Sequence, residues 1–292
     1  MLNYLTLDDS TGAAVTLHET GKRALSSVKG LIGISAVRAS TRDRPTAHGG
    51  IDETHWTGAK LVDVQGEVWS TVGQVDAYAE FRLIEAPMLQ TLDVGPALMK
   101  WQEGPDGLQL QRRVALASEV EPVLEEGAAF LKYQAQFYGE DPRAYSQTLE
   151  TVTSAALSAT TGGMVFPLIF PFTFAAGGGA TAAVTNAGNR PTPPMFRIHG
   201  GCTNPQVVLT GGPRIALTGT IAAGDYVEVD CATRTILLFT SGATVGVPRL
   251  NFYNAAVSRW YELPAGDTTL QMIADSFDGS AKLDVVFRSA YA

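Results

Sequence analysis

The chain is 292 residues long, and only 17% of these residues are charged, fewer than the roughly 25% usual for a soluble globular protein. Its formal net charge of −8 argues against nucleic-acid binding, which requires clustered Lys and Arg, and against binding to an anionic membrane surface. The N-terminal residues contain no basic segment followed by an apolar core, so we expect no secretory signal. The most apolar stretch, residues 164–176, is 13 residues long and contains two prolines, so we expect no membrane insertion.

The distribution of charge divides the chain near residue 150. Residues 1–150 contain 13 Lys and Arg against 21 Asp and Glu, whereas the rest of the chain contains 8 of each sign. Between these parts, 39 residues in succession, 151–189, carry no charge. We therefore predict an N-terminal domain over 1–150, an uncharged linker and crossover with Gly and Pro over 151–190, and a C-terminal domain over 191–292.

In the N-terminal domain, alternation of apolar and polar residues predicts strands over 61–69, 108–116 and 131–137. Residues 72–92 have apolar residues at a helical spacing instead, so we predict one helix there. Pro87 is expected to end this helix or to fall just after its last turn.

The C-terminal domain is a succession of short predicted strands separated by Gly, Pro and Asn turns. The predicted ranges are 195–199, 206–209, 214–218, 226–230, 235–239, 260–263, 269–274 and 283–288. No helical pattern intervenes, so the spacing indicates an antiparallel β-sandwich or barrel rather than a parallel α/β sheet.

A metal site is the first chemical hypothesis that the residues raise. His48, Asp52, Glu53 and His55 supply nitrogen and oxygen ligands within eight positions. The two histidines flank Gly49 and Gly50, however, and so lack the fixed geometry of a helical pair. A polar loop is the alternative that we favour, and we predict no metal-binding residues.

Catalytic patterns are equally sparse. The glycines at 177–179 are not followed by a P-loop lysine, and Ser35 lacks the second glycine of a nucleophile elbow. Glu119, Glu121, Glu125 and Glu126 could form a glycosidase pair, but a solvated acidic loop accounts for them as well. We predict no catalytic residues, no cofactor-binding residues and no cofactor.

Four tryptophans and two cysteines complete the candidates. Trp56, Trp69, Trp101 and Trp260 could stack on sugars or fill cores, and Trp260 is the strongest candidate for a stacking surface because Tyr261 follows it. Cys202 and Cys231 are interpreted as buried small hydrophobic residues, with a disulfide as the alternative.

Several runs, taken in order, resemble the distal tail protein (Dit) family of long-tailed, non-contractile bacteriophages and related tail-like particles. RASTRDRPTAHGG, KLVDVQGEVW and FLKYQAQFYGEDPRAYS resemble that family's N-terminal ring domain. TNAGNRPTPPMFRIHGGCTNPQVVL, GTIAAGDYVEVDCATRTILL and WYELPAGDTTLQM resemble its C-terminal domain. The resemblance implies a mainly β chain, with a β-rich ring domain containing one helix, then a galectin-like antiparallel β-sandwich.

The resemblance also implies a function. It predicts a structural virion protein at the tail tip, assembled in the host cytoplasm, whose homo-hexameric ring joins the tail tube to the tip and leaves a lumen for DNA. The implied partners are the tail tube protein, the tail tip or hub protein and the tape measure protein, with receptor-binding proteins as further candidates. Sequence-specific nucleic-acid binding is not implied.

Two other functions stay open. One is a saccharide-binding module that recognises the host envelope, although no long insertion carries a separate carbohydrate-binding module. The other is a glycan-cleaving enzyme. If the ring hypothesis is right, residues 1–150 drive assembly, and the loop over 38–55 pairs its mixed charges with a neighbouring subunit. Deleting 41–54 is then expected to leave a folded monomer.

Overall fold

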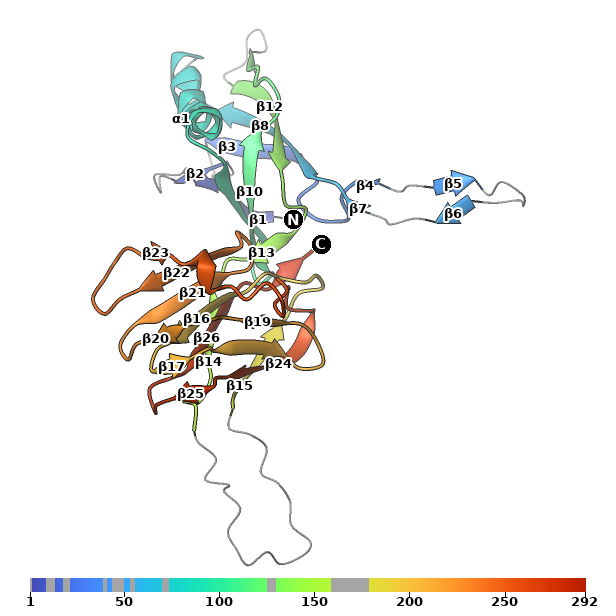
Figure 1. Cartoon of the computed structure of the whole chain (residues 1–292). Coiled ribbons are helices and arrows are strands. Elements are labelled where there is room, and N and C mark those ends of the chain that lie inside the picture. Colours follow the sequence, from blue (N-terminus) through green and yellow to red (C-terminus); the bar gives the residue numbers. More distant parts are fainter. Residues whose placement is uncertain are drawn as a thin grey trace, which may run out of the picture. The chain divides into compact units, whose positions relative to one another are not determined.

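A computed structural model describes residues 2–8, 14–17, 22–38, 41–43, 50–52, 56–69, 74–124, 130–158 and 179–292 (Figure 1). For 37–38, 41–43, 50–52, 56 and 74–75 it describes the backbone alone. The chain divides into unit 1, Met1–Thr148 with Tyr291–Ala292, and unit 2, Leu149–Ala290. Every strand pair of known register is antiparallel, in both units. The predicted mainly β fold is thereby confirmed, while its galectin-like character stays a prediction.

Unit 1 is built on one twisted sheet with the strand order β2-β1-β9-β10-β12-β8-β3, in which β11 also pairs with β12 and β13 with β10. Two short pairs, β4 with β7 and β5 with β6, form separate two-stranded sheets. The strands are β1 (Leu2–Asp8), β2 (Ala14–Thr16), β3 (Arg23–Lys29), β4 (Val37–Arg38), β5 (Thr41–Asp43), β6 (Gly50–Asp52), β7 (Trp56–Thr57), β8 (Lys60–Trp69), β9 (Ala97–Glu103), β10 (Gln109–Leu116), β11 (Val123–Leu124), β12 (Phe130–Gly139) and β13 (Ala144–Ser146).

The longest pairing in this sheet joins β8 to β12, residue by residue from Lys60 opposite Gly139 to Trp69 opposite Phe130. Apolar residues alternate along both strands, so each places one side chain in two on the core. Gly66 interrupts the apolar row, and the ring of Tyr133 on the facing strand covers it. A Cβ on Gly66 would lie 2.6 Å from that ring, which is why the row contains a glycine here.

The single helix of the described residues, α1 (Gln74–Asp93), packs on the core face of this sheet. Phe81, Ile84 and Met88 face the core and are almost fully buried. The prediction that Pro87 ends the helix is wrong, because Pro87 lies inside it. A proline within a helix removes one backbone hydrogen bond, but burial of the flanking Ile84 and Met88 offsets that cost.

Unit 2 contains three antiparallel sheets with the orders β14-β26-β16-β21-β22-β23, β15-β24-β18-β19 and β20-β17-β25. The strands are β14 (Glu150–Thr153), β15 (Ala180–Asn186), β16 (Met195–His199), β17 (Cys202–Thr203), β18 (Gln206–Leu209), β19 (Arg214–Ala216), β20 (Thr220–Ile221), β21 (Tyr226–Asp230), β22 (Thr235–Phe239), β23 (Val247–Pro248), β24 (Gly266–Ile273), β25 (Ser276–Phe277) and β26 (Leu283–Phe287), and a 3₁₀ turn, η1 (Leu250–Phe252), follows β23. A last strand, β27 (Ala290–Tyr291), belongs to none of these three sheets, and the boundary between the units falls within it.

The core of unit 2 lies between the six-stranded and the four-stranded sheet. Phe196, Val227 and Val285 from the first meet Val207 and Leu270 from the second in one buried cluster. Each sheet buries one face against the other, so apolar and polar residues alternate along its strands. This alternation is the pattern from which the strands were predicted.

The predicted strand over 260–263 is wrong. This segment forms only a bridge, in which Leu263 and Thr192 exchange two backbone hydrogen bonds of 2.8 and 2.9 Å. Tyr261 and Leu263 are both buried, so the alternation reflects packing on the core rather than a ladder. Pro264, which lacks an N–H donor, follows at once.

Within the range predicted as a linker, the described residues form β14 and β15. β14 pairs with β26 over four residues and β15 with β24 over seven, so both extend the sheets of unit 2. Residues 177 and 178 of the glycine cluster lie outside the described residues.

We propose that residues 149–290 fold alone, because the sheets of unit 2 and its core lie within this range. A fragment of these residues is expected to unfold in one cooperative thermal transition, followed by circular dichroism. The control fragment 191–290 lacks β14 and β15 and is expected to be unfolded or much less stable. Equal stability of the two fragments would contradict the division.

Candidate functional site

The predicted metal candidates are not brought into a described site. His48, Glu53 and His55 lie outside the described residues, and Asp52 ends β6, where only the backbone is described. Elsewhere in the described part of the chain, no three His, Cys, Asp or Glu side chains are close enough to hold a metal ion. None of the described helices is long and apolar enough to cross a membrane.

The acidic cluster is only partly described. Glu119 and Glu121 line a hollow of about 910 Å³ together with Gln65, Lys132 and Gln134, whereas Glu125 and Glu126 lie outside the described residues. This hollow lies over β8 and β12, on the face away from the core. Its lining combines amide groups with Glu67, Glu119, Glu121 and Lys132, so it is a polar sheet face with charges of both signs.

Both cysteines are free and buried, as interpreted from the sequence. Burial raises the pKa of the Cys202 thiol to about 11 and that of the Cys231 thiol to about 12. Such thiols remain protonated near neutral pH and are poor nucleophiles.

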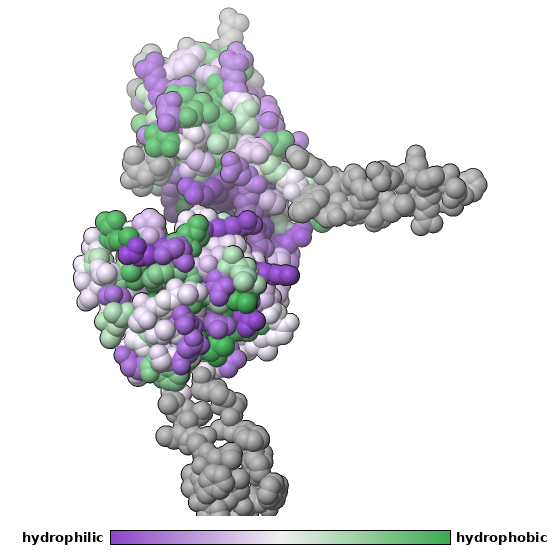
Figure 2. Space-filling model, in the orientation of Figure 1, coloured by the Kyte–Doolittle hydropathy of each residue, from purple (hydrophilic) through white to green (hydrophobic). Residues whose placement is uncertain are grey.

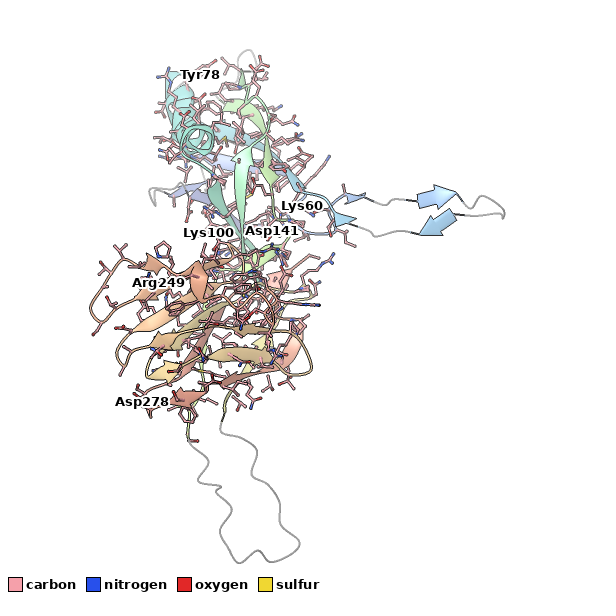
Figure 3. All side chains as sticks on the ribbon, viewed as in Figure 1. Lys60, Tyr78, Lys100, Asp141, Arg249 and Asp278 are labelled. Atoms are coloured by element: carbon pink, nitrogen blue, oxygen red, sulfur yellow. The ribbon has the colours of Figure 1, made fainter. Side chains whose placement is uncertain are left out.

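The most distinctive sequence run, FYGEDPRAYS, forms a local lock around Asp141. Asp141 is labelled in Figure 3. Its carboxylate accepts hydrogen bonds from the backbone N–H of Arg143 at 2.9 Å, from the Arg143 guanidinium at 2.9 and 3.0 Å, and from the Tyr145 hydroxyl at 2.6 Å. Burial opposes ionisation of Asp141, but these donors outweigh it and lower its pKa. The motif is therefore structural, and it fixes the turn between β12 and β13.

A buried cation that the sequence analysis did not single out organises this end of unit 1. Arg112 is only 1% exposed and donates to the carbonyl oxygens of Leu31, Pro142 and Arg143 at 3.1 to 3.2 Å. Its guanidinium also lies 5.5 Å from the centre of the Trp101 ring. A signal for it exists in the sequence, because the alternation of β10 places Arg112 on the same face as Leu110 and Val114.

Burial lowers the pKa of Arg112 to about 10, so the side chain still carries its charge near neutral pH. Lys60, labelled in Figure 3, adds a second cation to the same loop. Its Nζ lies 2.6 Å from the carbonyl oxygen of Gly33 and 3.3 Å from that of Ile32. Burial, and then the charge of Arg112, lower the pKa of Lys60. Two cations thus hold the backbone of residues 30–33 by its carbonyl groups.

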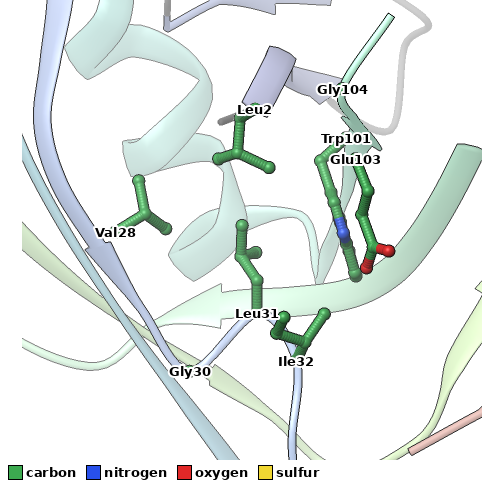
Figure 4. Close-up of a pocket in the computed structure, with 8 residues that line it drawn as sticks. All are labelled: Leu2, Val28, Gly30, Leu31, Ile32, Trp101, Glu103 and Gly104. Carbon is green, nitrogen blue, oxygen red and sulfur yellow. The ribbon is translucent and has the colours of Figure 1, made fainter. Parts of the chain in front are cut away.

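The loop held in this way presents apolar side chains to solvent. Ile32 is 61% exposed and Ile34 is 71% exposed. Beside them lies a pocket of about 430 Å³ lined by Leu2, Leu31 and Trp101, among others (Figure 4). We call Ile32 and Ile34 the apolar knuckle.

A second apolar surface lies at the C-terminal half of α1. Leu89 and Leu92 are 48% and 61% exposed, and with Leu116 and Val120 they line a groove of about 460 Å³. Hydrophobic residues, drawn in green, are visible in this part of unit 1 in Figure 2. We call this groove the helix groove. Unit 1 therefore exposes two apolar surfaces from different elements, which is typical of a protein that contacts other proteins.

Comparison with known proteins gives a consistent result. Residues 187–291 match the family model of the siphovirus-type tail component, C-terminal domain. No curated protein matches. Among solved structures, the Dit protein of phage SPP1, described as a paradigm of the hub adsorption apparatus in phages that infect Gram-positive bacteria, is similar over 99% of both chains, with a TM-score of 0.67 and 14% identity.

The baseplate of phage P2 in its activated conformation contains a similar chain in two structures. The structure with Ca matches over 98% of both chains with a TM-score of 0.55 and 13% identity, and that with Sr over 97% with 0.54 and 12%. At such identities the likeness shows the fold. Together with the C-terminal domain match, it confirms the predicted resemblance to distal tail proteins.

Replacing Arg112 by Met tests the clamp, by which we mean the hydrogen bonds from Arg112 to the carbonyl oxygens of Leu31, Pro142 and Arg143. The substitution leaves several buried carbonyl groups without a donor, so we expect unit 1 to lose about 3 kcal/mol or more of stability, measured by urea denaturation. Arg113→Met, at the exposed neighbouring position of β10, is the matched control and is expected to change stability little. Equal effects of the two substitutions would refute the clamp.

The Asp141 lock makes stability depend on pH. Because the folded-state pKa of Asp141 is lowered, its contribution is complete above the unfolded value of about 3.9 and is lost as pH falls through the folded pKa. The side chain is 38% exposed, and we therefore expect Asp141→Asn to cost only about 1 kcal/mol at pH 7 and less at pH 2. Urea denaturation at both pH values is the measurement, with Glu140→Gln as the exposed control.

Proposed function

We propose that this chain is a structural virion subunit: a distal tail, or baseplate hub, protein whose ring joins the tail tube to the tail tip. The observation that carries the proposal is the likeness to SPP1 Dit over 99% of both chains, which extends over both units of this chain. The match of residues 187–291 to the tail component domain supports it independently. In this role the chain acts through its contacts and not as an enzyme.

We propose further that unit 1 forms a six-fold ring. A ring of identical subunits needs two different faces on each subunit, because its contacts are head-to-tail. The apolar knuckle and the helix groove are two such surfaces, on the β3–β4 loop and on α1 with the segment after β10. Burying them between subunits would remove exposed Ile and Leu side chains from water, which stabilises the ring.

The two-stranded pairs β4–β7 and β5–β6 also support assembly with a neighbouring subunit. A two-stranded sheet is at best marginally stable in water unless it packs on something else. We propose that a neighbouring subunit supplies that support, so deletion of residues 41–54 leaves a folded monomer.

The polar face over β8 and β12 fits a lumen better than an interface. Gln65, Gln134 and Glu67 offer amide and carboxylate groups, and Gln136 is already paired with Asp63 at 2.7 Å. On this face Glu67, Glu119 and Glu121 outnumber Lys132, so we propose that it repels DNA phosphates and that DNA passes without adhering. In the proposed particle, the tail tube, tail tip or hub, and tape measure proteins are the partners, and the ring is assembled in the host cytoplasm.

The ring hypothesis predicts the mass of the assembled protein. Mass photometry of the full chain is expected to show a species of about six times the 31.0 kDa subunit, and residues 1–148 alone are expected to form the same number of subunits per ring. Negative-stain microscopy should show a central opening.

Two substitutions of matched chemistry locate the contacts. Ile34→Asp and Leu92→Asp, one on each apolar surface, are each expected to yield folded monomers, because each places a charge in a dry interface. Val245→Asp, at a site 77% exposed in unit 2, is the control and is expected to leave the ring intact. Rings that survive both unit 1 substitutions, or that require unit 2, would contradict this placement.

A further inference from the structure

Unit 2 contains a groove of about 600 Å³ that the ring hypothesis does not use. Its lining includes Val208, Arg214, Val257, Arg259 and Trp260, from β18, β19 and the segment that follows η1. None of its lining residues carries a negative charge. In a chain with a net charge of −8, a groove lined by two arginines and no acid is an unusual local environment.

The two arginines are held side by side by the backbone. The N–H of Arg259 donates to the carbonyl oxygen of Arg214 at 2.9 Å. Next to it, the buried hydroxyl of Ser258 accepts from the N–H of Ala216 at 2.8 Å and donates to the carbonyl oxygen of the same residue at 3.1 Å. The segment is thereby fixed to β19, and the positions of both arginines are set before any ligand arrives.

Neither guanidinium has a carboxylate of the described residues within ion-pair distance. The hydrogen bond from Arg214 Nη1 to Gln206 Oε1 is 3.5 Å long, at the limit for such a bond. Two like charges on neighbouring backbone segments repel each other, and an anion between them would remove that repulsion. A guanidinium binds phosphate and carboxylate groups in the same forked geometry.

Trp260 supplies the third element. Its indole stacks on Tyr253, with the ring centres 4.9 Å apart and the planes 5° from parallel. The stack fixes the orientation of the indole, and the Trp260 side chain also lines the groove. An oriented aromatic ring beside hydrogen-bond donors suits a ligand that has both an apolar ring face and polar groups, as a saccharide does.

We propose that this groove binds an anionic saccharide, with the sugar ring against Trp260 and its phosphate or carboxylate between Arg214 and Arg259. One groove of this size gives weak binding. In the proposed ring, which this step alone assumes, several copies would act together on a polymer and raise the overall affinity.

The test is binding of the full-length protein to immobilised polymers by biolayer interferometry. The probes are polygalacturonate, which carries carboxylates, phosphomannan, which carries phosphates, and neutral mannan. We expect binding to at least one anionic polymer and none to mannan, and which polymer binds distinguishes carboxylate from phosphate. Arg214→Gln with Arg259→Gln is expected to weaken binding at least tenfold, and Trp260→Ala to weaken it as well.

The matched control is Arg234→Gln with Arg249→Gln, which removes the same charge from unit 2 at positions outside the groove. It is expected to change the affinity less than twofold. An equal loss in the control, equal binding of mannan, or tighter binding of single-stranded DNA that depends on Arg214 and Arg259 would overturn the proposal. Mass photometry of the same variants separates the two hypotheses, because the groove substitutions should not affect ring formation.

Discussion

The buried guanidinium of Arg112 is the constraint on which the described surface of unit 1 depends. A charge without a carboxylate in direct contact is costly to bury, and here carbonyl groups satisfy it instead. Those carbonyls belong to the loop after β3 and to the turn after β12, two segments about 110 residues apart in sequence. One side chain on β10 therefore joins both segments, and neither can move without leaving a buried donor unpaired.

This arrangement explains how unit 1 keeps apolar residues exposed without losing their positions. Because Ile32 and Ile34 are exposed, their side chains contribute little hydrophobic free energy to ordering the loop. Other interactions must therefore offset the conformational entropy that the loop loses. Arg112 and Lys60 supply these from below, through backbone carbonyls and not through the isoleucine side chains. The apolar knuckle remains available for a partner, and the entropy of ordering it has been lost before association.

The sequence predicted an element correctly where its pattern of apolar residues matched the residues that are buried in the fold. It failed where contacts between distant segments decided the structure. β8 and β12 alternate between buried and more exposed residues along their length, and both were predicted almost to their ends. β1 was missed because a register shift between Leu2 and Tyr4 breaks its alternation. Pro87 was misjudged because the rule that proline ends helices is local, whereas the burial of Met88 that carries α1 past it is tertiary.

The candidate surfaces were less accessible to such reasoning, for a physical reason. Trp260 was noticed as an aromatic residue, but its significance depends on Arg214, which is 46 positions away and reaches it only through the pairing of the Arg259 backbone with β19. The alternation of β10 places Arg112 on the core face with Leu110 and Val114, but the carbonyl groups that it binds lie on distant segments and cannot be inferred from that pattern. Residues that come from different segments form no motif of fixed spacing in the sequence. Such a site can therefore be recognised only in the folded structure.

Both units are built from antiparallel sheets, but they expose different kinds of side chain. Unit 1 buries the cations Arg112 and Lys60 and exposes the apolar knuckle and the helix groove, an arrangement suited to permanent contact with other proteins. Unit 2 has its apolar residues in the core between two sheets and exposes two cations beside an aromatic ring, an arrangement suited to a reversible polar ligand. The difference lies in which side chains each unit exposes to solvent. The proposed assembly surfaces consist of unit 1 residues and the proposed binding groove consists of unit 2 residues, so the two share no residue.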